Sequence, residues 1–148
     1  MQITIILNPN VKKSKFKMNK IELLKDSDIS IYFKSFKDSY SEMKSLCPGI
    51  LRSFIKDSIN DDFIIKLSKR KKLIGFATIK MLNSKNIFLN LICTEKGLGT
   101  QLINIIKEIS KKMEIEYIKT DSLDTAVPFY LKNEFQVSQD TCKMTFEI

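Results

Sequence analysis

Residues 87–113, IFLNLICTEKGLGTQLINIIKEISKKM, have the pattern of a strand, a glycine turn and an amphipathic helix in direct succession. The apolar run Ile87 to Cys93 is typical of a strand. From the turn onward, apolar residues recur every three or four positions, which is the helical period, at Leu98, Leu102, Ile105, Ile106, Ile109 and Met113. Residues 98–113 are therefore predicted to form a helix that packs on a sheet.

The turn Gly97-Leu98-Gly99 is the most unusual local feature, because the chain has only four glycines and two of them lie here. A helix N-terminus has amide groups without partners and a partial positive charge, and glycine lets a ligand approach the backbone closely. The turn is therefore predicted to bind an anion such as a phosphate. A tight turn without a ligand is the alternative. The sequence lacks both the Gly-Lys-Ser/Thr of a P-loop and the third glycine of a dinucleotide fingerprint.

The composition, 148 residues with 43% hydrophobic content, predicts one globular domain over residues 1–148. No apolar run approaches the roughly 18 residues that a membrane span requires. The first residues also lack the layout of a signal peptide. We therefore expect a soluble cytoplasmic protein with no membrane partner. Cys47, Cys93 and Cys142 are odd in number and widely spaced, and are expected to be reduced thiols.

The chain has no histidine, which excludes Ser-His-Asp and Cys-His nucleophile systems and most zinc sites, so no metal is expected. The net charge is +8, but it comes almost entirely from lysines spread along the chain, with Arg52 and Arg70 the only arginines. This pattern does not imply a nucleic-acid partner. The densest basic cluster, Lys69-Arg70-Lys71-Lys72, is predicted to form a solvated hairpin tip.

The remaining elements are predicted from apolar period and turn residues. The sheet begins with either Ile3 to Leu7 or Ile21 to Leu24. Helices are expected from Asp28 to Met43, from Pro48 to Ile59, and from a cap at Asp124 or Thr125 to Lys132. Further strands are expected at Phe63 to Leu67, Leu73 to Met81, Tyr117 to Thr120, Phe135 to Val137 and Lys143 to Ile148. The short connections around Leu73 to Met81 imply antiparallel neighbours.

This order of elements resembles the GNAT superfamily of N-acetyltransferases. The segment TEKGLG, residues 94–99, is similar to the family's acetyl-CoA signature. The segment AVPFYLKNEF, residues 126–135, is similar to a second family motif in which a Phe-Tyr pair lies on a short helix. The resemblance implies an α/β (α+β) fold with a mixed, mostly antiparallel central sheet of six or seven strands, flanked by about four helices.

The resemblance also implies an acetyl-CoA-dependent N-acetyltransferase that transfers acetyl directly to a primary amine. Acetyl-CoA would be the co-substrate, and Tyr130 would be the general acid. The exposed backbone of Leu91, Ile92 and Cys93 would pair with the pantetheine arm. Lys96 would add positive charge, and the pyrophosphate would be held by the backbone amides of Gly97, Leu98, Gly99, Thr100 and Gln101.

Two parts of the reaction are less defined by the sequence. The aromatic residues Tyr32, Phe33 and Phe36 are expected to border the acceptor pocket, although their spacing also suits a core. For the general base, the strand offers only Asn90, whose amide cannot act as a base. Asp121, Asp124 and a water molecule relayed through backbone carbonyls all stay open as candidates.

A second reading is a GNAT-like module that binds CoA or a partner protein without catalysis. It is motivated by Thr94, which stands where the family usually has Arg or Gln, and by Glu134, which replaces the usual Gly before Phe135. The partners expected on the first reading are acetyl-CoA and an unidentified amine. The chain is expected to be a monomer or a homodimer.

Overall fold

The computed structural model describes residues 1–25, 28–138 and 142–148, and its central feature is one mixed sheet. Among the described residues this sheet has eight strands in the order β2-β1-β3-β4-β5-β6-β8-β7. The strands are β1 Gln2–Leu7, β2 Ser30–Phe33, β3 Phe63–Lys69, β4 Lys72–Met81, β5 Asn86–Thr94, β6 Tyr117–Asp121, β7 Gln136–Val137 and β8 Lys143–Glu147. β2 runs parallel to β1 and β6 parallel to β5, whereas the other neighbours are antiparallel.

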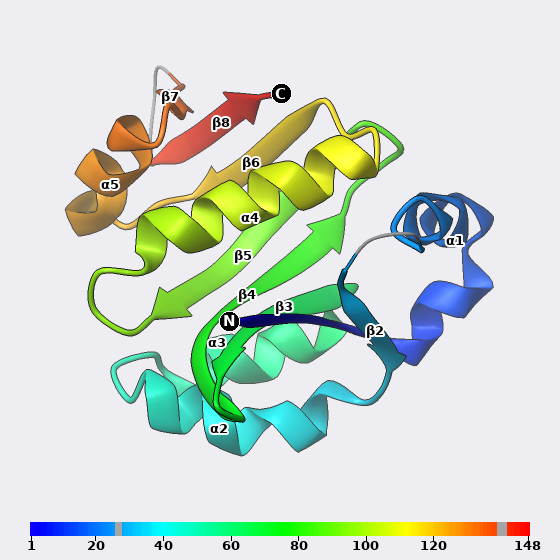
Figure 1. Ribbon diagram of the computed structural model, residues 1–148. Coiled ribbons are helices and arrows are strands. Elements are labelled where there is room, and N and C mark those ends of the chain that lie inside the picture. Colours follow the sequence, from blue (N-terminus) through cyan, green and yellow to red (C-terminus); the bar gives the residue numbers. More distant parts are fainter. Residues whose placement is uncertain (26–27, 139–141) are drawn as a thin grey trace.

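The α-helices of the described part cover both faces of the sheet (Figure 1). They are α1 Lys15–Glu22, α2 Tyr40–Leu46, α3 Arg52–Asp57, α4 Gly99–Lys112 and α5 Val127–Lys132. The apolar stripe of α4 and residues of α1 pack into the larger buried core, while α2 and α3 pack with Phe76 of β4 into a second core on the other face. Apolar side chains alternate between the faces of β4, so both faces of this central strand are buried.

The predicted mixed α/β sheet is confirmed, with more strands than expected. The three-strand meander β3-β4-β5 and the long helix α4 lie where the sequence placed them. The basic tip between β3 and β4 is confirmed as well, because Arg70 and Lys71 adopt positive φ angles of 52° and 65°. Such angles are typical of the tight two-residue turn that joins antiparallel strands.

The predicted helix from Asp28 to Met43 is wrong in its first half. Residues Ser30–Phe33 form β2, and the helix α2 begins only at Tyr40. Ile31 and Phe33 pack against the larger core, whereas Tyr32 between them is 49% exposed. A short apolar run does not distinguish a strand from a helix, and here pairing with the edge of β1 decides for the strand.

The first strand is Ile3 to Leu7, within β1, and the alternative at Ile21 to Leu24 is wrong because these residues end α1 and its last turn. The predicted cap of the helix before Lys132 is also not observed. Neither Leu123 nor Ala126, the N-cap residues there, makes a side-chain capping bond. The Asp124 carboxylate instead accepts a hydrogen bond from Cys142 Sγ at 2.9 Å.

The expectation of three reduced thiols is wrong for one pair, because Cys47 and Cys93 form a disulfide. Cys47 directly follows α2, and Cys93 lies on β5. The two residues are 46 positions apart in sequence, but packing of α2 on the sheet brings their Cα atoms to 6.5 Å. That separation is within the range that a disulfide can bridge. Cys142 is a free cysteine.

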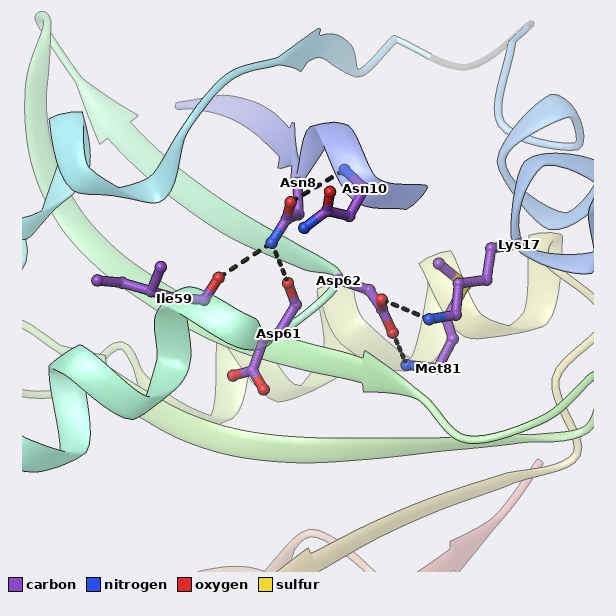
Figure 2. Close-up of polar contacts among 7 residues, drawn as sticks. All are labelled: Asn8, Asn10, Lys17, Ile59, Asp61, Asp62 and Met81. Carbon is purple, nitrogen blue, oxygen red and sulfur yellow. Dashed lines mark hydrogen bonds and ion pairs between the residues drawn. The ribbon is translucent and has the colours of Figure 1, made fainter. Parts of the chain in front are cut away.

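A polar network joins the loop before β3 to the end of β4, to α1 and to the residue that follows β1 (Figure 2). The Asp62 carboxylate accepts a hydrogen bond from the Met81 amide at 2.6 Å and pairs with Lys17 Nζ at 2.7 Å. Asn8 Nδ2 donates to the carbonyls of Ile59 at 3.0 Å and Asp61 at 3.2 Å. The network therefore holds the loop before β3 against β1, β4 and α1.

Replacing Asp62 with alanine is expected to lower the free energy of unfolding by about 2–3 kcal/mol, because a buried amide and an ammonium lose a charged partner. Urea denaturation measures this change. Glu22→Ala is the matched control, since Glu22 pairs with Lys25 on the surface with side chains 53% and 68% exposed. Its effect is expected to stay within about 0.5 kcal/mol. Equal losses in the two variants would contradict the role of Asp62.

None of the helices in the described part is long and apolar enough to cross a membrane. Residues 1–25, 28–138 and 142–148 also contain no group of three or more acidic or cysteine side chains placed to hold a metal ion.

Candidate active site

The site is built where β5 separates from β6. Residues Asn86 to Leu89 of β5 pair with β6, but β5 continues to Thr94 while paired only with β4. Within the described residues, the β6-facing backbone edge from Asn90 onward therefore has no strand partner. An unpaired strand edge of this kind can pair with an extended ligand as an added strand would.

A cavity of about 540 Å³ lies at this separation. It is bounded by the end of β5, the turn before α4 and the helix α5, which lies beside the first turn of α4 in Figure 1. The lining residues are Ile92, Cys93, Thr94, Gly97, Gly99, Thr100, Ala126, Phe129, Tyr130 and Lys132.

The first turn of α4 points toward this cavity without a side-chain cap. Leu98 occupies the N-cap position and makes no capping bond, and the first turn contains no acidic residue. Gly97 has a φ of 91°, which an L side chain rarely adopts, and a Cβ on Gly99 would lie 2.8 Å from Cε1 of Phe129. Both glycines are thus required by the local geometry. The Leu98 amide already donates to the Glu95 carbonyl at 3.2 Å, so the amides offered to an anion are those of Gly97 and of the first turn of α4.

Tyr130 is held rigidly beside the cavity. Its side chain is 5% exposed, and its ring packs edge-on against Phe129 at 5.3 Å and Phe135 at 5.2 Å between centroids. Burial raises the pKa of the Tyr130 phenol, against a smaller lowering by a hydrogen bond with Thr120. The phenol therefore stays protonated at neutral pH and is suited to donate a proton.

Asn133 ties α5 to α4. Its Nδ2 donates to the Phe129 carbonyl at 2.9 Å and to Thr100 Oγ1 at 3.4 Å. The backbone carbonyl of Asn133 accepts a hydrogen bond from Lys107 Nζ at 2.7 Å. The next residue, Glu134, has a φ of 72°, the left-handed conformation that favours glycine. This explains why glycine is usual at that position in the family the sequence resembles.

The structure brings only some of the predicted cofactor residues to the cavity. Six predicted site residues line it: Ile92, Cys93, Gly97, Gly99, Thr100 and Tyr130. Leu91, Lys96, Leu98 and Gln101 are not among the lining residues. The amide of Leu91 is already bonded to Thr78 Oγ1 at 3.1 Å.

The predicted acceptor residues lie elsewhere. Tyr32 and Phe33 belong to β2, and β1, β3 and β4 separate that edge strand from β5. Phe36 is 2% exposed and packs in the core under α2. Phe33 and Phe36 pack in the two cores and Tyr32 is exposed on the edge strand, so none of the three lines the cavity.

Several lining residues were not predicted. Thr94, Ala126, Phe129 and Lys132 complete the cavity wall, and Lys132 places an ammonium group there. Lys132 follows the Phe129-Tyr130 pair by one turn of α5, so helical spacing from that pair would have indicated it. The site thus offers backbone amides, a cation and an unpaired strand edge, which fits the pyrophosphate and amide-containing arm of CoA.

A family model described as an acetyltransferase (GNAT) domain matches residues 42–145 of the chain. The protein therefore belongs to the GNAT acetyltransferase family, and its mixed α/β sheet is the fold of that family. A search of curated protein sequences finds no significant match.

Solved structures share the fold at low sequence identity. Tetrahymena GCN5 superposes with a TM-score of 0.66 at 16% identity, over 100% of this chain and 96% of that chain. A GNAT family acetyltransferase from Elizabethkingia anophelis with acetyl-CoA bound gives 0.57 at 12% identity, over 74% and 90%. The aminoglycoside 6'-N-acetyltransferase from Enterococcus faecium gives 0.54 at 14% identity, over 76% and 90%.

Proposed function

We propose that this protein transfers the acetyl group of acetyl-CoA directly to a primary amine, without a covalent enzyme intermediate. The observation that carries the proposal is the cavity that joins the uncapped start of α4, the unpaired edge of β5 and the buried Tyr130. Two of the structures with similar folds, a histone acetyltransferase and an aminoglycoside N-acetyltransferase, are named for acceptors that carry amines.

Each part of the cavity has a chemical task in this proposal. The amides of Gly97, Gly99, Thr100 and Gln101 hold the pyrophosphate, while the Leu98 amide is bonded to the Glu95 carbonyl. Lys132 is a lining cation, and Lys96 lies on the exposed turn nearby. The free edge of β5 at Ile92 and Cys93 pairs with the pantetheine amides.

Tyr130 protonates the sulfur as the carbon–sulfur bond breaks. A buried site raises the basicity of the departing thiolate as well as that of the phenol, so the proton transfer stays feasible.

Acetyl-CoA at 100 times its Kd is expected to stabilise the protein by about 2.7 kcal/mol. For a chain of this length that corresponds to a rise in melting temperature of roughly 5–10 °C. Scanning fluorimetry measures the shift, and release of free CoA is then followed with spermidine, a lysine-containing peptide, a peptide N-terminus and kanamycin. No shift at saturating acetyl-CoA would overturn the proposal.

The alternative is a CoA-binding module without catalysis, motivated by Thr94 and Glu134 and by the absence of a carboxylate on the described residues of β5. It predicts the same thermal shift but no CoA release with any amine.

We further propose that residues 1–148 form a single acetyltransferase domain, a monomer or homodimer located in the cytoplasm. Disulfides are rare in the cytoplasm, so counting thiols on protein kept from air checks that location. A reduced Cys47–Cys93 pair would agree with the cytoplasm, and an intact disulfide would contradict it.

A further inference from the structure

The backbone of β5 is distorted at Asn90, where the strand leaves β6. Ile79 of β4 pairs with Leu89 and Thr78 with Leu91, so Asn90 between them has no partner on β4. The Leu91 amide, displaced by this bulge, donates to Thr78 Oγ1 at 3.1 Å. Bulges are common next to active sites because they re-aim a side chain. Here the bulge directs the side-chain amide of Asn90 toward the loop before β3.

That loop supplies a buried carboxylate. Asp61 is 5% exposed, and its Oδ2 accepts a hydrogen bond from Asn90 Nδ2 at 3.0 Å. Its backbone is fixed on both sides, since its amide donates to the Ser58 carbonyl at 2.9 Å and its carbonyl accepts from Asn8. Figure 2 shows the carboxylate pointing away from Asn8 and from Lys17. Asp61 is thus held without an ion-pair partner among the drawn residues.

Tyr130 reaches the same point of β5 from the other face. Its phenol lies beside Thr120 of β6, whose hydroxyl donates to the Leu89 carbonyl at 2.7 Å. Tyr130 belongs to the core under α4, whereas Asp61 follows α3 on the opposite face. The Tyr130 phenol, a proton donor, and the Asp61 carboxylate, a proton acceptor, therefore lie on opposite faces of the sheet near the adjacent residues Leu89 and Asn90. The unpaired edge of β5 begins at this point.

The surroundings make the Asp61 carboxylate more basic than usual. Burial raises its pKa above 3.8, and the neighbouring charge of Asp62 adds to the rise. Hydrogen bonds from Asn90 and Thr78 and the charge of Lys80 oppose it. Asp62 is itself committed to Lys17 and the Met81 amide, which leaves Asp61 as the carboxylate directed at the bulge.

We propose that Asp61 is the general base of the acetyl transfer and takes a proton from the acceptor ammonium at the Asn90 bulge; this rests on the function proposed above. With the proton on Asp61, the nitrogen lone pair forms the carbon–nitrogen bond to the acetyl carbonyl carbon. The carbon–sulfur bond breaks, and the thiolate takes the Tyr130 proton. The second nitrogen proton, lost as the amide forms, restores Tyr130 through solvent, and Asp61 returns its proton to solvent.

The test compares wild type with Asp61→Asn as a function of pH, using the best amine of the four named above. At pH 7 the variant's kcat/KM is expected to fall about 10²-fold or more. The loss is expected to shrink as pH approaches the pKa of the amine used, about 10.4 for a lysine side chain and about 8 for a peptide N-terminus, because the amine then arrives without its extra proton. Wild type should also lose activity at acid pH as Asp61 becomes protonated, and this limb, which is separate from the titration of the amine, should be absent from the variant.

Stability separates a catalytic from a structural role. Because the pKa of Asp61 is higher in the folded protein than in the unfolded chain, the free energy of unfolding falls as pH rises from the unfolded pKa through the folded pKa. At neutral pH, Asp61→Asn removes a buried charge and is expected to melt no lower than wild type. Asp57→Asn, an exposed acid at the end of α3, is the matched control and is expected to change neither rate nor pH profile.

Three results would count against Asp61 as base. No loss at pH 7, or a loss of the same size at every pH, would overturn this inference and leave the proposed function intact. A wild-type protein that shows the acetyl-CoA thermal shift but releases CoA with none of the four amines would overturn both.

Discussion

Replacing Tyr130 with phenylalanine is expected to lower kcat by about 10²- to 10⁴-fold while leaving acetyl-CoA affinity nearly unchanged. The substitution removes the only proton that the side chain can donate but keeps the ring, which packs against Phe129 and Phe135. The lost hydrogen bond with Thr120 costs about 1 kcal/mol of stability. Steady-state CoA release together with the acetyl-CoA thermal shift measures both effects.

Tyr117→Phe is the matched control, because Tyr117 lies at the opposite end of β6 from Thr120 and does not line the cavity. It is expected to keep wild-type kcat. If Tyr130→Phe also kept wild-type kcat, the departing thiolate would have to take its proton from another group. A loss of the thermal shift in Tyr130→Phe would instead assign the residue to binding.

A single methyl group at position 99 is expected to weaken acetyl-CoA binding by about 5- to 150-fold, the equivalent of 1–3 kcal/mol. In Gly99→Ala the new Cβ would lie 2.8 Å from Cε1 and 3.1 Å from Cζ of Phe129. The ring and the short helix α5 must move, and they carry the cavity wall with them. Isothermal titration with acetyl-CoA measures the change in Kd.

Gly49→Ala provides the control, since a Cβ there would have no atom within 4 Å. Its Kd for acetyl-CoA is expected to equal that of wild type. Equal affinity in Gly99→Ala would mean that the turn adapts freely, and the amides from Gly97 to Gln101 would then not be the pyrophosphate site.

The elements that sequence predicted well have strong local signals. The apolar stripe of α4 repeats over four turns, and the strands β3, β4 and β5 alternate with short turns, so period alone defines them. β2 was missed because Tyr32 and Phe33 continue the helical spacing of the apolar residues that follow them. In the structure, Ile31 and Phe33 pack on the larger core as alternate residues of a strand do. Only the neighbouring β1 distinguishes the two structures, and that contact is not local.

The candidate site divides in the same way. The glycine turn and the Phe129-Tyr130 pair are contiguous motifs, so their residues could be found without the fold. The Asp61–Asn90 contact joins residues 29 positions apart, and neither residue carries a motif of its own. The aromatic residues expected at the acceptor pocket do not line the cavity, because apolar spacing along the chain does not report which cavity a side chain faces.

The amino-acid sequence by itself determined the family, the meander, the glycine turn before α4 and the position of the candidate acid, because each depends on residues close together in the chain. The tertiary structure decided the edge strand β2, the Cys47–Cys93 disulfide and the approach of Asp61 to β5. These three depend on packing between distant segments, and the free energy that selects such contacts comes from surfaces that only the folded sheet brings together.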